Sequence, residues 1–345
     1  MKSIAELDQS YSPKHNVVEI ELSDSATQDG EPLSEPLSEP LSEPSVEITL
    51  QDPEKSKETY RLESRALADD VAAHPNGHLD EDITEQITKQ ESYKEVITAS
   101  ATHIGTREYQ QDSLKVTDTL CFRPGEEAKA YGIVCDGMGG LEAGAEVSGL
   151  VAQLLSNRFD EIDVSSQDIP KWLREVIYDI DMEAVDLYGR ENAGTTLAAA
   201  LLLGEKLYWV SVGDSRVYLI RKGEIVQVTR DHNLRLHLLE QLEHGEISQE
   251  EYDETPKKEA LISFIGSGAP ELIDVNRDPF ILKNGDIILL CTDGLTKSLS
   301  DEEINMVVAK HYGDIKEAAR LLPLVAFDVG GPKDNTSVVL MQFFE

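Results

Sequence analysis

Four short apolar segments between residues 197 and 229 constrain the fold more than any other feature of this chain. They cover Leu197–Leu203, Leu207–Val212, Arg216–Ile220 and Ile225–Thr229, and short turns containing glycine separate them. Connections this short join antiparallel neighbours, whereas parallel strands need long crossovers. The sequence therefore predicts antiparallel sheets and argues against a Rossmann-type alternation of strands and helices.

Further strands and helices follow from apolar periodicity on either side of this region. β-branched or continuous apolar runs predict strands at Val96–His103, Tyr131–Cys135, Asp286–Cys291 and Thr336–Phe343. Helical spacing of apolar residues predicts helices at Ala143–Phe159 and Ile169–Tyr188, and capping patterns predict two more beginning near Ser300 and Asp314. Hairpin strands with inserted helix pairs indicate an α+β domain.

The amino-acid composition of the chain changes near residue 93. Residues 1–92 are acidic and rich in Pro, Glu and Ser, and Glu31–Pro44 is a tandem Glu-Pro-Leu-Ser repeat that supports neither helix nor sheet. We expect this part to be a disordered extension, inert by default, with a tether, an inhibitory segment and a docking arm as open alternatives. Residues 93–345 are expected to form one domain.

Charge and composition exclude several classes of protein. The formal net charge of −35 disfavours nucleic-acid binding, and a solvated acidic surface, metal binding or attraction of basic partners could each account for it. No secretory signal or membrane-spanning run is present, so no membrane association is expected. Three scattered cysteines fit a reducing, cytoplasmic location, and Cys135 and Cys291 read as small core residues.

Three aspartates share one local context, an apolar strand meeting a polar or Gly-containing loop. Asp136 and Asp293 follow predicted strands, and Asp334 precedes one. Each alone could simply cap a turn, but together they would make an oxygen-rich site suited to Mg²⁺ or Mn²⁺. No nucleophile motif or zinc-type histidine spacing is present. A water activated by two clustered divalent ions is therefore the expected nucleophile.

An ordered set of motifs resembles one known family. The motifs are Arg107-Glu-Tyr-Gln-Gln-Asp112, Asp136-Gly-Met-Gly-Gly140, Gly194-Thr-Thr196, Gly213-Asp-Ser-Arg216, Cys291-Thr-Asp-Gly294 and Asp334-Asn335. Together they resemble the type 2C metal-dependent protein serine/threonine phosphatases, in the bacterial branch, which has Met rather than His after Asp-Gly. The resemblance runs from about residue 100 to 344.

The resemblance implies an αββα sandwich of two antiparallel sheets flanked by helix pairs, with a dinuclear metal site at one end. By position, Asp136 would bridge both ions, the Gly137 carbonyl would bind one, and Asp293 and Asp334 would bind the other. Asp112 would hold a water, and the guanidinium of Arg107 would grip substrate phosphate.

The resemblance extends to further positions, and at some of them this chain differs from the family pattern. Residues from 232 to about 265, closing around the segment Ala260–Gly266, resemble a mobile flap beside the site, and Asn335 is expected to orient the Asp334 loop. Gln110 and Glu191 stand where the family has Asn and Asp. Glu191 is either a ligand of a weak third ion or a plain loop carboxylate, and His232 is expected to make a structural hydrogen bond, with general acid as the alternative.

The implied activity is hydrolysis of phosphoserine and phosphothreonine in proteins, opposing a serine/threonine kinase in signal transduction. A monomer is expected. The alternatives are a pseudo-phosphatase, kept as a binding or regulatory module, and a hydrolase of small phosphoesters. Retention of the metal carboxylates and Arg107 favours the enzyme.

Overall fold

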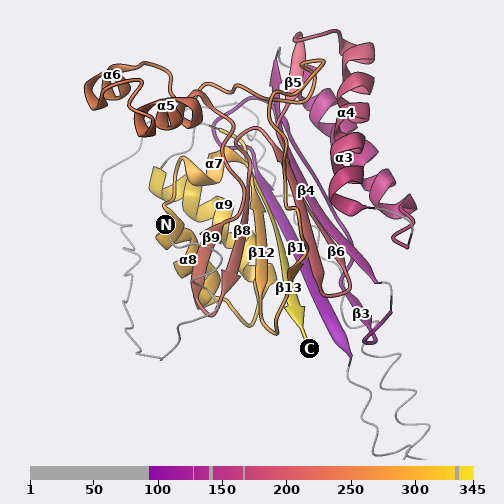
Figure 1. Ribbon diagram of the computed structural model, residues 1–345. Helices are drawn as coiled ribbons and strands as arrows, with labels where there is room; N and C mark the ends of the chain where they lie inside the picture. The colour runs from indigo at the N-terminus through magenta and orange to yellow at the C-terminus, as the bar shows by residue number, and fades with distance from the viewer. Residues whose placement is uncertain (1–92, 127, 140–142, 166–167, 331–333) are drawn as a thin grey trace, which may run out of the picture.

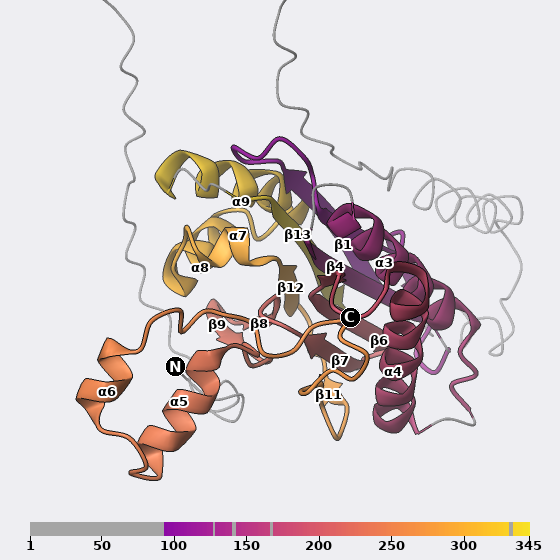
Figure 2. The same cartoon turned by 90° about the horizontal axis from the view of Figure 1, so that it is seen from above.

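The computed structural model describes residues 93–126, 128–139, 143–165, 168–330 and 334–345. The expectation of a disordered extension over residues 1–92 lies outside this range. The described part has two antiparallel sheets packed face to face, with helices on both outer faces (Figures 1 and 2). This arrangement confirms the αββα sandwich.

The first sheet has the order β3-β1-β13-β12-β8-β9. Its strands are β1 (Lys94–His103), β3 (Leu120–Phe122), β8 (Arg216–Arg221), β9 (Glu224–Gln227), β12 (Ile287–Cys291) and β13 (Thr336–Phe344). The two ends of the described chain pair here, because β1 runs antiparallel to β13 from Glu95 opposite Phe344 to His103 opposite Thr336.

The second sheet has the order β10-β7-β6-β4-β2, with β11 beside β7 and β5 beside β4. Its strands are β2 (Asp112–Val116), β4 (Lys129–Gly139), β5 (Ala193–Thr195), β6 (Leu197–Leu203), β7 (Lys206–Val212), β10 (Asp274–Val275) and β11 (Phe280–Ile281). The predicted hairpin run is confirmed, but its last two strands pair in the first sheet rather than the second.

Helices cover the outer face of each sheet. On the second sheet lie α3 (Ala143–Glu161) and α4 (Ile169–Tyr188), and on the first lie α7 (Asp293–Thr296), α8 (Asp301–Lys310) and α9 (Ile315–Gly330). The helices α5 (Leu234–Glu243) and α6 (Gln249–Glu254) stand away from the sandwich (Figure 2). Within the described ranges, no helix is long and apolar enough to cross a membrane.

Apolar side chains fill three layers, one between the sheets and one beneath each helix layer. β12 shows why its sequence is apolar throughout: Ile288 and Leu290 face the other sheet, while Leu289 and Cys291 face the helices. A strand buried on both faces needs no polar alternation. Cys135 and Cys291 are fully buried in these layers, as predicted.

Candidate functional site

Five aspartates come together where the ends of the two sheets meet. Asp112 begins β2 and lies directly opposite Asp136 on β4. Asp293 opens α7 two residues after β12 ends, Asp334 lies two residues before β13 begins, and Asp214 occupies the turn between β7 and β8. The Thr292 hydroxyl donates to Asp112 Oδ2 at 2.9 Å, which joins the two sheets at this point.

Asp136 lies inside a strand rather than after one, which corrects the sequence interpretation. β4 continues through Asp136 to Gly139, because β5 pairs with Gly137–Gly139 beyond the point where β6 ends its pairing. The Asp136 carbonyl accepts from Thr196 N and Thr195 Oγ1, each at 2.9 Å. The strand therefore holds Asp136 rigidly beside Asp112.

Burial and mutual repulsion raise the pKa values of these carboxyl groups. Burial is the largest cause for Asp112, whose pKa rises to about 7 despite hydrogen bonds, and the charges of Asp293 and Asp334 add to it. Burial, then Asp112 and Asp293, raises the pKa of Asp136 well above its usual range. Burial and Asp293 raise that of Asp214 to about 7. Like-charged carboxylates in a desolvated cluster indicate a site built to receive cations.

Two buried oxygen atoms in this cluster fit that interpretation. Among the described residues, Asp112 Oδ1 and Asp293 Oδ1 are buried with no hydrogen-bond partner. Carboxylate oxygens are the donors that Mg²⁺ and Mn²⁺ prefer, so the donor set fits a divalent ion. In the described part of the chain, no three His, Cys, Asp or Glu side chains are already arranged to hold an ion.

Two positively charged side chains contact Asp293 and Asp334, the carboxylates that the family resemblance assigns to one metal ion. The ammonium of Lys297 contacts Asp293 and lies 3.4 Å from Asp334 Oδ2. Arg107 Nη2 lies 3.0 Å from Asp334 Oδ1. Burial is the largest single influence and lowers the pKa of Lys297, but the charge and hydrogen bond of Asp293 and the charges of Asp334 and Asp214 together raise the pKa to about 12. The structure thus places Arg107 at the site, with half of its side chain exposed.

Backbone atoms crowd the glycines of the site. A Cβ on Gly137 would lie 2.2 Å from Gly144 O and 2.6 Å from Gln111 O, and one on Gly294 would lie 2.0 Å from Asn335 O. Only glycine fits at either position without moving backbone. Gly137 therefore belongs to the site wall, and its ligand role stays a prediction.

Asn335 ties the Arg107 loop to the start of β13. Its Nδ2 donates to Ile104 O at 2.8 Å and Tyr109 O at 3.2 Å, and its Oδ1 accepts from Gln111 N at 2.8 Å. Gln110 keeps the loop in place as well, because its amide donates to Thr102 Oγ1 and accepts from Asp112 N. The side-chain amide of Gln110 thus makes structural hydrogen bonds, although the family has Asn at this position.

The flap, residues 232–265, is held at both ends. At its start the fully buried His232 accepts from Gly213 N at its Nδ1 and points Nε2 toward Asp274, 3.6 Å away. Beyond its end, Asp181 Oδ1 on α4 accepts from the backbone N–H groups of residues 266–268. This geometry supports a structural role for His232. Glu191 is exposed in a left-handed conformation with φ of 59°, and its third-ion role stays a prediction.

Sequence reasoning missed two members of the cluster, Asp214 and Lys297. Asp214 belongs to the motif Gly213-Asp-Ser-Arg216 and follows a buried strand at the same distance as Asp293 does, which is the signal that could have assigned it to the site. Lys297 carried the signal of i,i+4 spacing from Asp293, which places both on one side of a helical turn.

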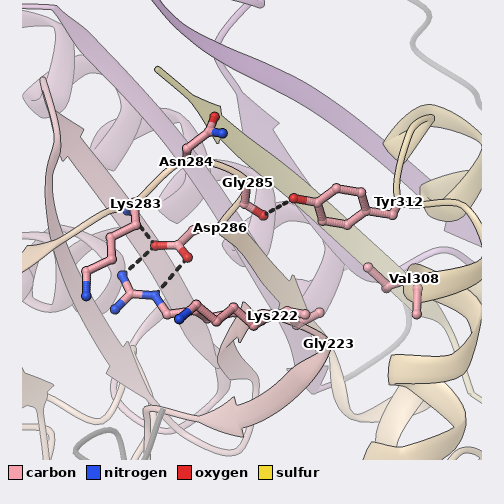
Figure 3. A pocket seen from close by; sticks show the side chains of 11 residues that line it. Lys222, Gly223, Lys283, Asn284, Gly285, Asp286, Val308 and Tyr312 are labelled. Carbon is pink, nitrogen blue, oxygen red and sulfur yellow. Dashed lines mark hydrogen bonds and ion pairs between the residues drawn. The ribbon is translucent and has the colours of Figure 1, made fainter. Parts of the chain in front are cut away.

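A pocket of about 320 Å³ lies at the opposite end of β12 and takes no part in this site. Figure 3 shows Asp286 in the pocket wall, accepting both from Arg221 and from the backbone of Lys283. The five-residue strand Ile287–Cys291 separates Asp286 from the site end of the sheet. This pocket is therefore distinct from the carboxylate cluster.

Comparisons with known proteins agree with this geometry. The family model for protein phosphatase 2C matches residues 98–237. The serine/threonine phosphatase stp of Listeria monocytogenes is 35% identical over 217 residues, which span 61% of this chain and 83% of that protein.

Solved structures extend the likeness to the whole described domain. The Streptococcus agalactiae serine/threonine phosphatase superposes with a TM-score of 0.61 at 27% identity, over 71% of this chain and 98% of that one. The catalytic domain of the serine/threonine phosphatase PstP, solved with two manganese ions, gives a TM-score of 0.55 at 28% identity, over 73% of this chain and all of that one. The chain therefore belongs to the protein phosphatase 2C family of metal-dependent serine/threonine phosphatases.

Proposed function

We propose that the carboxylate cluster is the active site for hydrolysis of phosphoserine and phosphothreonine in proteins. The supporting observation is the convergence of Asp136, Asp293 and Asp334 with two buried carboxylate oxygens that have no partner among the described residues. In this proposal Asp136 and the Gly137 carbonyl hold one Mg²⁺ or Mn²⁺ ion, and Asp136, Asp293 and Asp334 hold a second. Glu191 is a candidate ligand for a weaker third.

Bound divalent ions would supply Lewis acidity that strengthens water as a nucleophile and neutralises charge on the phosphoryl oxygens. The chain's own groups then orient the reactants. In this proposal Asp112 Oδ1 accepts a hydrogen bond from the attacking water, since Oδ2 already accepts one from Thr292. Arg107, half exposed at the rim, presents a guanidinium fork that suits two phosphate oxygens.

Phosphoprotein substrates fit the position of the flap beside this end of the sandwich (Figure 1). An enzyme of this kind opposes a serine/threonine kinase in signal transduction, and we propose that it acts as a monomer in the cytoplasm. The buried thiols of Cys135 and Cys291 support the reducing compartment. A pseudo-phosphatase is not favoured, since every assigned carboxylate and Arg107 are present.

The test is phosphate release from a phosphothreonine peptide with and without Mn²⁺. Wild type should release phosphate only with the metal, and Asp293→Asn should lose at least about a hundredfold in rate, because it removes a charged ligand and keeps the side-chain shape. Asp179→Asn makes the same chemical change on the exposed face of α4 and should match wild type. No metal-dependent release from folded wild type would overturn the proposal.

A further inference from the structure

Lys297 is the residue that most sets this metal site apart from a plain carboxylate cluster. Its backbone N–H donates to Asp293 O at 2.8 Å, closing the single turn of α7. The ammonium contacts the Asp293 carboxylate and lies 3.4 Å from Asp334 Oδ2. One cation thus stands between the two carboxylates assigned to the second divalent ion.

This contact differs from the ordinary surface ion pairs of the molecule. Only 13% of the Asp293 side chain and 25% of the Asp334 side chain are exposed. The pair Lys171–Glu175 on α4 has the same i,i+4 spacing, but its side chains are 72% and 62% exposed and 3.6 Å apart. Solvent screens the α4 pair, whereas the carboxylates facing Lys297 are largely withdrawn from water.

The turn of α7 limits where the Lys297 ammonium can go. Residues four apart on a helix have neighbouring side chains, so the Lys297 side chain starts from the side of α7 that carries Asp293. Just over half of the Lys297 side chain, 54%, is exposed, which leaves a route outward into solvent. A divalent ion can therefore displace the ammonium but cannot remove its charge from the neighbourhood.

We propose that Lys297 is an internal competitor of the divalent ion at Asp293 and Asp334, and that it sets the free metal concentration at which the enzyme loads. The inference rests on the proposed assignment of these two residues as ligands. A unit positive charge about 5 Å from a divalent ion in water weakens its binding roughly tenfold. The effect is electrostatic, so it declines as salt is added.

Calorimetric titration of the full-length, metal-stripped chain with Mn²⁺ alone tests the proposal without any activity assay. Lys297→Gln should bind Mn²⁺ roughly tenfold more tightly than wild type, and Lys297→Met should agree with it. Lys297→Arg keeps the charge and should stay within about threefold. Lys171→Gln removes the same charge from the exposed α4 pair and should leave the affinity unchanged.

Thermal unfolding separates competition from a structural role. In chelator, Lys297→Gln should unfold at a lower temperature than wild type, because the carboxylates lose their counter-charge. At a fixed, sub-saturating Mn²⁺ concentration its gain in unfolding temperature should exceed that of wild type, because tighter binding stabilises more. A purely structural lysine would lower both temperatures equally.

The outcomes distinguish this inference from the proposed function. Equal Mn²⁺ affinities in wild type and Lys297→Gln, with binding abolished by Asp293→Asn, would overturn the role of Lys297 and leave the metal site intact. Failure of folded wild type to bind Mn²⁺ would overturn both.

Discussion

Asp112 and Asp136 face each other directly across the adjacent antiparallel strands β2 and β4. Like charges in that position destabilise a sheet, and burial raises the pKa of both carboxyl groups. The metal-free domain therefore carries an electrostatic strain that bound cations would relieve. The arrangement of Asp112 and Asp136 that suits cation binding therefore lowers the stability of the metal-free domain.

Asp136→Asn should make that opposition measurable. In chelator, the variant should be more stable than wild type by about 1 kcal/mol, because a neutral amide no longer repels Asp112 and Asp293. Its phosphatase activity should fall at least about a hundredfold, since it loses a ligand. Denaturant unfolding and peptide hydrolysis give the two values. A variant less stable than wild type in chelator would contradict the account of the cluster.

Arg107→Lys tests the fork-like recognition of phosphate. Lysine keeps the charge but presents a single point rather than two parallel donors. We expect KM for a phosphothreonine peptide to rise about tenfold with a smaller change in kcat. Arg277→Lys makes the same change at an exposed position and should behave as wild type. An unchanged KM in Arg107→Lys would show that the two parallel donors of Arg107 are not used in phosphate recognition.

Asp181 should anchor the loop that follows the flap. Its side chain is 1% exposed and its Oδ1 accepts three backbone N–H groups of residues 266–268. Asp181→Ala leaves those donors unsatisfied and should lower the unfolding free energy by about 2 kcal/mol. Amide hydrogen exchange in residues 262–268 should accelerate.

Two further variants, one at the same residue and one nearby on α4, serve as controls for this prediction. Asp181→Asn keeps an acceptor oxygen and should retain most of the protection, while Asp179→Ala alters an exposed residue of the same helix and should change nothing. Unchanged exchange in Asp181→Ala would show that the other contacts of the loop hold it.

Asp274 should contribute stability that disappears in acid. Burial alone would raise its pKa, but the nearby His232 ring and the hydrogen bonds from Arg230 hold the pKa below the usual 3.8. The folded state then binds this proton less readily than the unfolded state, so the contribution is complete above about pH 4 and is lost below it.

Comparison of wild type with Asp274→Asn across pH checks the sign. The variant should be less stable by about 1 kcal/mol at pH 7, a modest value because more than half of the Arg230 side chain is exposed. The difference should be the same at pH 5 and shrink below pH 4. A difference that grows in acid would refute the assignment.

Local patterns were enough to predict much of the fold. Helix α4 spans Ile169–Tyr188 as predicted, because Asp168 caps it and Pro170 suits its first turn. The capping box predicted near Ser300 is present. Each of these signals depends on residues within a few positions, which a sequence shows directly.

Contacts between segments that are distant in the sequence could not be predicted from local patterns. Nothing local indicates that β1 pairs with β13, or that Asp181 holds a loop some 85 residues away. The strand length of β4 depends on pairing with β5, so Asp136 was expected at a strand end rather than inside a strand. Asp214 and Lys297 were missed because their importance comes from the neighbours that folding supplies.

The crowding at Gly137 and Gly294 has a consequence for how enzymes on this scaffold diversify. Main-chain atoms form this part of the site wall, and a single added methyl group at either position would collide with them. A library that randomises both positions should therefore return glycine alone among active clones. Divergence in substrate preference is left to the flap and to the Arg107 loop, where side chains reach solvent.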